Sequence, residues 1–111
     1  MTDTISLDEF NKAEMRVGKV LEAIDVEKSE KLIKLTVDFG EFGKRIIFTG
    51  VRGYGYTGVD FKGKQFLFVT NLEPKKMGEE ESQGMILAVG CDEGKPIFVS
   101  AEGMPVGSKV R

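Results

Sequence analysis

The sequence predicts an all-β fold, a small barrel of five short strands, because its apolar residues alternate in short runs and no segment has the pattern of a long helix. The alternation is clearest in residues 31–39, where the residues between the inward-facing ones would face outward. The inward set is Ile33, Leu35, Val37 and Phe39. Residues 66–69 are apolar without alternation, which indicates a strand covered on both faces. Runs of this kind between glycine-rich segments favour a barrel or a β-sandwich.

A short helix is predicted near the start of the chain. Ser6 and Glu9 have the spacing of a capping box, in which the serine hydroxyl accepts from the glutamate amide and the carboxylate bonds back to the serine amide. Ile5 and Phe10 stand at the two positions of a hydrophobic staple. We expect a helix over roughly residues 7–12, too short to be stable unless it packs on other elements.

Residues 15–26 predict a long first strand whose apolar face changes partway along. The apolar set before the change is Met15 and Val17, and the set after Gly18 is Val20, Ile24 and Val26. A change of phase at a glycine predicts a β-bulge at Gly18 that bends the strand. A bent strand that pairs with two neighbours is what a small closed barrel requires.

The other strands follow at short intervals. We expect them at residues 31–39, 44–49, 64–72 and 85–90, with a C-terminal extension as a further strand at 96–99. Between the third and fourth strands, residues 57–60 can cap a brief helical turn. This order favours the OB-fold, a five-stranded barrel that binds oligonucleotides on one face, and leaves the β-sandwich as the alternative.

Length and charge limit the possible functions. The 111 residues predict a single domain, residues 1–111, and the 41% hydrophobic and 31% charged residues are typical of a folded soluble chain. The net charge of −2 gives no overall attraction to nucleic acid. However, residues 44–76 hold seven basic and two acidic side chains, a net charge of +5 that can form a local positive patch.

Cysteine and histidine usage argues against a metal protein or an enzyme. Cys91 is the only cysteine and histidine is absent, so we expect Cys91 to be structural and no metal or cofactor to be bound. No constellation of carboxylates, lysine or tyrosine points to catalysis, which makes a binding module the better hypothesis. The single cysteine, the missing leader and the lack of a long apolar run predict a cytoplasmic protein that does not contact membranes.

Two glycine-containing signals have simpler explanations. The segment Arg52-Gly53-Tyr54-Gly55-Tyr56 matches the start of the RNA-recognition-motif signature, but that signature belongs on a strand, whereas the surrounding glycines favour a loop. The two tyrosines can stack on bases, yet anchoring of the loop is the simpler expectation. The pair Gly50 and Gly53 lacks the Lys-Ser/Thr that follows in a phosphate-binding loop.

Residues 71–85 carry the strongest functional signal. They lie between two apolar strands and contain Pro74, the pair Lys75-Lys76, the triplet Glu79-Glu80-Glu81 and the sequence Ser82-Gln83-Gly84-Met85. Loops held by rigid strands are frequent binding sites, so we expect a binding loop here, with a solvated hairpin connection as the alternative.

Three segments resemble the tRNA-binding OB domain. They are Phe10-Asn11-Lys12-Ala13-Glu14-Met15-Arg16-Val17-Gly18-Lys19-Val20, residues 29–38, and the combination Asn71-Leu72-Glu73-Pro74-Lys75-Lys76-Met77 with Ser82-Gln83-Gly84-Met85. This family includes stand-alone structure-specific tRNA-binding proteins and the C-terminal domain or β subunit of methionyl-tRNA synthetases. The similarity extends from about residue 7 to residue 110.

The resemblance implies a homodimeric OB barrel that binds the tRNA body by shape, with methionyl-tRNA synthetase as a partner. Lysines would contact phosphates, while asparagine and serine would contact ribose hydroxyls or exposed base edges. The site residues implied by the resemblance are Lys31, Lys34, Asn71, Lys75, Lys76, Ser82 and Met85. Each residue has an alternative role: Asn71 and Ser82 would cap the loop, and Met85 would lie in the core. Lys31 and Lys34 would be ordinary solvated charges.

The chain departs from the family pattern between Lys76 and Ser82. Relatives have a basic or aromatic residue there, followed by apolar residues, whereas this chain has Met77-Gly78-Glu79-Glu80-Glu81. The three carboxylates either weaken tRNA binding, each by on the order of 1 kcal/mol, or point away and tune specificity.

A second class of function stays open. Export-related chaperones of the same superfamily share the amino-terminal pattern Phe…Arg-Val-Gly-Lys and bind peptides. Their sequence differs from the pattern that this chain retains in residues 71–85. Structure-specific tRNA binding is therefore the main hypothesis, and a peptide-binding chaperone is the alternative.

Overall fold

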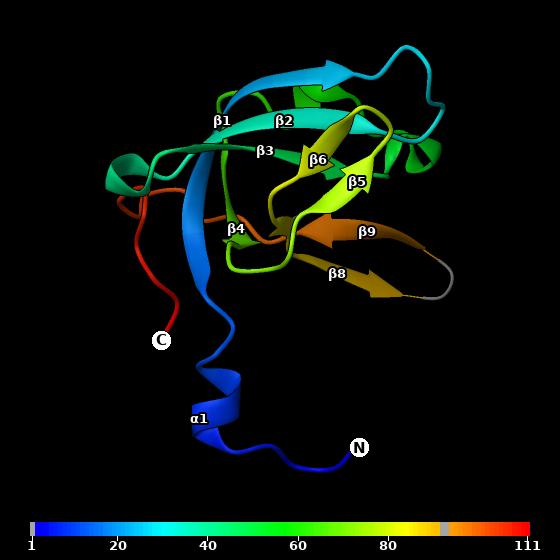
Figure 1. The fold of residues 1–111 in the computed structure, drawn as a ribbon. Coiled ribbons are helices and arrows are strands. Elements are labelled where there is room, and N and C mark those ends of the chain that lie inside the picture. Colours follow the sequence, from blue (N-terminus) through cyan, green and yellow to red (C-terminus); the bar gives the residue numbers. More distant parts are fainter. Residues whose placement is uncertain (1, 92–93) are drawn as a thin grey trace.

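An antiparallel sheet of five strands curls into a nearly closed barrel (Figure 1). The computed structural model describes residues 2–91 and 94–111. The strand order is β3-β2-β1-β4-β7, with the bounds β1 Met15–Asp25, β2 Ile33–Asp38, β3 Lys44–Thr49, β4 Gln65–Val69 and β7 Met85–Ile86. This arrangement confirms the predicted all-β, five-stranded OB-fold barrel.

Strand β1 is long enough to pair with two neighbours, β4 along its first half and β2 along its second. The predicted bulge is present, but its predicted position at Gly18 is wrong, because the register shift lies between Val20 and Glu22. Gly18 has a different role. A Cβ atom there would lie 2.5 Å from Val37 Cγ1, so the missing side chain lets the core pack directly on the backbone of β1.

The hydrophobic core fills the inside of the barrel. Its largest fully buried side chains are Val20, Ile33, Leu35, Val37, Phe39, Ile47, Phe61 and Phe68, which confirms the inward set predicted for residues 31–39. The rings of Phe39 and Phe68 meet edge to face with centroids 5.4 Å apart. In β4, Phe66 and Phe68 are buried and Leu67 is half-buried, so the chain itself covers both faces of this strand.

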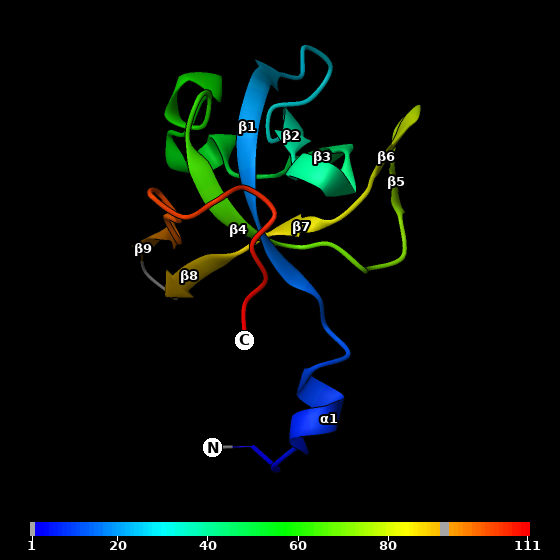
Figure 2. The same ribbon diagram turned by 90° about the vertical axis from the view of Figure 1, so that its left-hand side faces the viewer.

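Helix α1 spans Leu7–Phe10 and ends before the predicted residue 12. Its capping box forms as predicted, with the Glu9 amide donating to Ser6 Oγ at 3.1 Å and the Ser6 amide donating to Glu9 Oε1 at 3.3 Å. The helix buries no residue and stands away from the barrel (Figures 1 and 2). Its apolar side chains are therefore left uncovered.

In the described part of the chain, short 3-10 helices connect strands: η1 (Gly40–Phe42), η2 (Arg52–Tyr54) and η3 (Gly58–Asp60). The helical turn predicted before the fourth strand is η3, whose Asp60 carboxylate accepts a hydrogen bond from the Thr57 amide at 2.8 Å. A Cβ atom on Gly58 would lie 2.3 Å from the carbonyl oxygen of Ala23. Glycine at this position lets η3 lie directly against β1.

The strand predicted at residues 85–90 is divided in two. β7 ends at Ile86, and β8 (Ala88–Cys91) pairs instead with β9 (Gly94–Phe98), which is the predicted C-terminal extension. The chain then returns to the barrel, where the carbonyl oxygen of Ser108 accepts from the Val17 amide at 2.9 Å. Within residues 2–91 and 94–111, no helix has the length and apolar character needed to cross a membrane.

Candidate functional site

Residues 71–85, predicted to form a loop, contain a β-hairpin that projects from the barrel between β4 and β7 (Figure 2). Its strands are β5 (Lys75–Met77) and β6 (Glu80–Ser82), joined by a turn in which Gly78 has a φ angle of +72°. The cross-strand pairs are Lys75–Ser82, Lys76–Glu81 and Met77–Glu80. The loop prediction is wrong for this part because two short, polar strands give no apolar alternation to detect.

The base of the hairpin closes the barrel against β3. Ser82 is buried, and its hydroxyl accepts from the Phe48 amide at 3.0 Å and donates to the Gly84 carbonyl at 3.1 Å. The Ile46 amide donates to the side-chain oxygen of Gln83 at 3.0 Å, and the Gln83 amide donates back to the Ile46 carbonyl at 2.8 Å. Ser82 therefore has a structural role, since its hydroxyl already donates and accepts within the protein.

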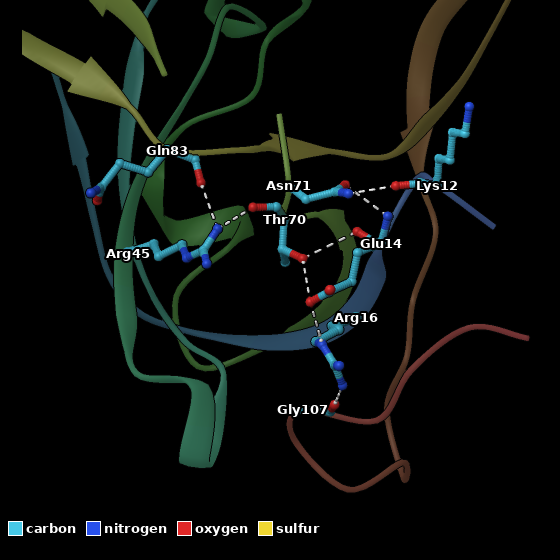
Figure 3. Close-up of polar contacts among 8 residues, drawn as sticks. All are labelled: Lys12, Glu14, Arg16, Arg45, Thr70, Asn71, Gln83 and Gly107. Carbon is cyan, nitrogen blue, oxygen red and sulfur yellow. Dashed lines mark hydrogen bonds and ion pairs between the residues drawn. The ribbon is translucent and has the colours of Figure 1, made fainter. Parts of the chain in front are cut away.

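Asn71 ties the N-terminal segment to the end of β4 (Figure 3). Its Oδ1 accepts from the Glu14 amide at 2.7 Å, and its Nδ2 donates to the Lys12 carbonyl. The amide of Thr70 donates to the Glu14 carbonyl at 2.8 Å. The Asn71 side chain is thus satisfied within the protein and fixes the path of the chain between α1 and β1.

Two arginines extend this network (Figure 3). Arg45 of β3 donates from Nη1 to the carbonyls of Thr70 and Gln83, so it joins the residues before and after the hairpin segment. Arg16 Nε donates to Glu14 Oε1 at 2.7 Å, and this bond is the largest cause of the lowered pKa of Glu14. Sequence reasoning missed Arg45 and Gln83, because their role depends on contacts between strands far apart in the chain.

A cleft of about 560 Å³ lies beside the hairpin. It is lined by Phe48, Leu72, Glu73, Lys75, Met77, Ser82, Gly84 and Met85. Met85 is 47% exposed and therefore contributes to the cleft surface, not to the core. The apolar lining side chains suit the face of an unstacked nucleobase, and Lys75 is the cation among the lining residues that can contact the attached phosphate, beside the acidic Glu73.

The two predicted lysines of the hairpin are separated by the strand geometry. Lys75 lies on the same face as its cross-strand partner Ser82 and lines the cleft. Lys76 lies on the opposite face, where its cross-strand partner is Glu81. Only Lys75 of this pair therefore lies next to Met85 in the cleft.

The two other predicted lysines differ in their surroundings. Lys34, in β2, forms an ion pair with Glu80 of the hairpin, with 2.7 Å between Nζ and Oε1. Lys31 is exposed, precedes β2, and does not line the cleft of Lys75. The structure thus brings Lys34 into contact with the hairpin, whereas Lys31, within the described residues, neither pairs with a hairpin residue nor lines the cleft of Lys75.

Arg52 and Tyr56 anchor the glycine-containing segment around residue 52 to the rest of the protein. This segment forms η2 and a loop, and Arg52 Nη1 donates to two carbonyls in the turn between β1 and β2. The Tyr56 hydroxyl donates to a carbonyl of β9 at 2.6 Å, while Tyr54 is exposed. The described residues contain no cluster of three or more side chains that could hold a metal ion, and the side chain of Cys91 lies outside them.

Comparison of the sequence with known families gives a match to the family described as "Putative tRNA binding domain" over residues 15–109. The chain is 43% identical over 108 residues to methionine–tRNA ligase of Methanococcus aeolicus, a match that covers 97% of this chain and 16% of the ligase. The ligase of Stenotrophomonas maltophilia is also 43% identical over 108 residues, covering 93% and 16%. The chain therefore spans about one sixth of the length of these relatives.

The fold is also found in solved structures, among them the following two. The MetRS related protein from Pyrococcus horikoshii has a TM-score of 0.92 and 40% sequence identity, with coverage of 99% of this chain and 100% of that protein. The chaperone CsaA from Bacillus anthracis has a TM-score of 0.87 at 24% identity, with coverage of 98% and 100%, which shows a common fold alone. The family match over residues 15–109 includes the barrel, the hairpin and the residues that line the cleft. The chain therefore belongs to the tRNA-binding domain family.

Proposed function

We propose that the chain binds tRNA, either as an independent module or as an accessory part of methionyl-tRNA synthetase. The observation that carries this proposal is the family match over residues 15–109. The cleft beside the hairpin supports it, because its lining combines apolar side chains with Lys75, although Glu73 adds one acidic group there. Such a surface suits RNA with unstacked bases, which tRNA presents in its loops.

In this proposal tRNA is recognised by shape. Lys75 contacts a phosphate and Met85 packs against a base or ribose in the cleft, while Lys31, Lys34 and Lys76 provide further phosphate contacts. Asn71 and Ser82 act indirectly, since their hydrogen bonds hold the hairpin and the N-terminal segment in place. Because phosphate contacts carry no sequence information, different tRNAs are expected to bind with similar affinity.

The chain acts by binding and not by catalysis in this proposal. It corresponds to about one sixth of the ligases that it matches, so it is not expected to attach methionine to tRNA by itself. We also propose that it works in the cytoplasm with methionyl-tRNA synthetase as its partner. Faster methionylation of tRNA by purified synthetase after addition of the chain would support that partnership, and an unchanged rate would contradict it.

A gel-shift titration tests the function. The ligands are bulk tRNA, a duplex RNA and an unfolded peptide, each at two salt concentrations. We expect the tightest binding to tRNA, and weaker binding at the higher salt concentration because lysine–phosphate contacts release counterions. Binding of the peptide without binding of tRNA would refute the proposal and favour the peptide-binding chaperone.

We further propose that the functional unit is a homodimer. Uncovered apolar side chains occur on two projecting elements: Leu7 and Phe10 on α1, and Val89 and Ile97, a cross-strand pair of the β8–β9 hairpin. Exposed apolar side chains that are neighbours, as Val89 and Ile97 are, can form part of an association surface. The apolar run at residues 66–69 would also favour a dimer if one face of β4 were uncovered, but the chain itself covers both faces.

Light scattering tests the dimer. The expected species has twice the 12.3 kDa mass of the chain at micromolar concentration. Val89→Ser together with Ile97→Ser should shift it toward the monomer, because the buried apolar area is lost. Val59→Ser is a matched control, since Val59 is 83% exposed but lies on η3. A monomer in the unchanged protein would contradict the proposal.

A further inference from the structure

One lysine of the proposed site is already bound to a carboxylate of the hairpin. The Nζ atom of Lys34 lies 2.7 Å from Oε1 of Glu80, and the two side chains are 29% and 49% exposed. Lys34 belongs to β2 in the barrel wall, and Glu80 is the first residue of β6. The ion pair therefore connects the barrel to the hairpin close to its turn.

This ion pair lies in a second cleft of about 590 Å³. Phe48 and Met77 line both this cleft and the cleft of Lys75, so an RNA strand that follows the hairpin would pass both lysines. The charged side chains of the second cleft are Asp25, Glu27, Lys28, Lys34, Glu79 and Glu80. Four of these six are acidic, which leaves Lys28 and Lys34 as the cations available to a phosphate there.

The three carboxylates of the acidic triplet differ in what they face. Glu79 lies in the turn, Glu80 pairs with Lys34, and Glu81 is the cross-strand partner of Lys76. Within the described residues, Glu80 is the member of the triplet that forms an ion pair. The departure from the family pattern therefore has its most direct effect at Lys34.

We propose that Glu80 is an internal competitor for RNA phosphate at Lys34 and thereby sets the strength of tRNA binding. This inference rests on the proposed tRNA-binding function. Carboxylate and phosphate oxygens both accept charge-assisted hydrogen bonds from an ammonium group, so the same Nζ protons serve either partner. A bound tRNA must displace Glu80 before Lys34 contributes to affinity.

The exchange is energetically feasible because both side chains are partly exposed. Ion pairs of this kind contribute little stability in water, so a phosphate can replace the carboxylate when other contacts hold the RNA in place. The net gain from Lys34 is nevertheless reduced, since one anion is exchanged for another. Glu80 thus makes tRNA binding weaker and its release easier than the number of lysines would suggest.

A double-mutant cycle tests the inference. The affinity for tRNA is measured by fluorescence anisotropy for the unchanged protein, Glu80→Gln, Lys34→Gln and the variant with both changes. Glu80→Gln should tighten binding about threefold to fivefold, which corresponds to about 0.7–1 kcal/mol. In the Lys34→Gln background the same change should tighten binding less than about twofold, because no ammonium group remains to be released.

The control variant is Glu41→Gln. Glu41 is exposed, lies in η1 and lines neither cleft. Its substitution therefore changes the net charge of the protein by the same amount as Glu80→Gln, but away from the proposed RNA path. Its affinity for tRNA should not change. If Glu41→Gln tightened binding as much as Glu80→Gln, the effect of Glu80 would be one of net charge alone. That result would overturn the inference.

The other outcomes separate this inference from the proposed function. Equal tightening by Glu80→Gln in both backgrounds would show general repulsion without competition, and unchanged affinity would show no effect of Glu80. Either result overturns the inference while tRNA binding by the unchanged protein upholds the proposed function. Absence of tRNA binding by the unchanged protein would overturn both.

Discussion

Lys75 and Lys76 are adjacent in the sequence, yet they lie on opposite faces of the β5–β6 hairpin. Lys75 is opposite the buried Ser82 and lines the cleft, whereas Lys76 is opposite the exposed Glu81. Strand alternation therefore divides what the sequence presents as one basic pair. The two lysines are expected to contribute unequally to binding.

The first prediction concerns these lysines. Lys75→Ala should weaken tRNA binding about threefold to tenfold, and equally for different tRNAs, because a phosphate contact carries no sequence information. Lys76→Ala should weaken it by about twofold or less, since Glu81 already offsets its charge. Anisotropy titrations with two tRNAs at several salt concentrations measure both effects. Unchanged affinity and salt dependence after both changes together would exclude the hairpin as the contact surface.

Ser82→Ala should act on stability and not on RNA contact. The change leaves the Phe48 amide without its side-chain acceptor in a buried position, which should lower the free energy of unfolding by about 1–2 kcal/mol. Thr36→Val is a suitable control, because it removes the hydroxyl of a half-buried β2 residue that takes no part in the hydrogen bonds at the base of the hairpin. Urea unfolding measures the difference. A stable variant with much weaker tRNA binding would instead indicate direct contact.

Two substitutions at Asn71 separate its two hydrogen bonds. Asn71→Ala removes both, so the Glu14 amide should exchange its hydrogen faster and stability should fall by about 1 kcal/mol. Asn71→Asp keeps an acceptor for the Glu14 amide, and that amide should stay protected. Hydrogen exchange followed by NMR measures this contrast. Equal exchange rates in both variants would contradict the anchoring role.

Gly18→Ala should destabilise the barrel by about 1–3 kcal/mol, the range for overpacking of a core. The added Cβ atom would lie 2.5 Å from Val37, 2.7 Å from Phe39 and 2.8 Å from Phe68, all at ordered side chains of the core. Gly50→Ala is the matched control, since nothing lies within 4 Å of its Cβ position. Denaturant unfolding of both variants measures their free energies of unfolding. Equal values for Gly18→Ala and Gly50→Ala would show that the core near Gly18 can rearrange to accept the added methyl group.

Features that depend on neighbours in the sequence could be predicted. The capping box between Ser6 and Glu9 needs only local spacing, and it forms as expected. The alternation of Ile33, Leu35 and Val37 predicts which side of β2 is buried without knowledge of its partners. The spacing of capping residues and the two-residue period of a strand are therefore enough to predict the helix cap and much of the core.

Features that depend on contacts between distant segments could not be predicted. The phase change in β1 indicates a bulge but not its position, which follows from the pairing of β1 with β2 beyond Val20. The roles of Ser82 and Arg45 become visible only when β3 lies against the base of the hairpin. The pattern in residues 71–85 predicts a binding segment, but the separate structural roles of its residues depend on how the hairpin lies against β3.

The pKa of Glu14 provides a prediction for the pH dependence of stability. The hydrogen bond from Arg16 is the largest cause that lowers this pKa from its usual value of 4.5, and Thr70 and the charges of Arg16 and Lys109 act in the same direction, against the raising effect of burial. A group whose pKa is lower in the folded state stabilises the fold above its unfolded-state pKa. This contribution is lost as the pH falls from about 4.5 through the folded-state pKa.

Glu14→Gln should therefore destabilise the protein at pH 7 and have progressively less effect as the pH falls below about 4.5. The effect at pH 7 should not exceed about 1 kcal/mol, because the Glu14 side chain is 36% exposed and solvent screens the ion pair. Urea unfolding between pH 7 and pH 3 measures it. In an Arg16→Gln background the difference should shrink, since the main cause of the pKa shift is gone. A difference between Glu14→Gln and the unchanged protein that stays constant from pH 7 to pH 3 would show that the charge of Glu14 does not contribute to stability.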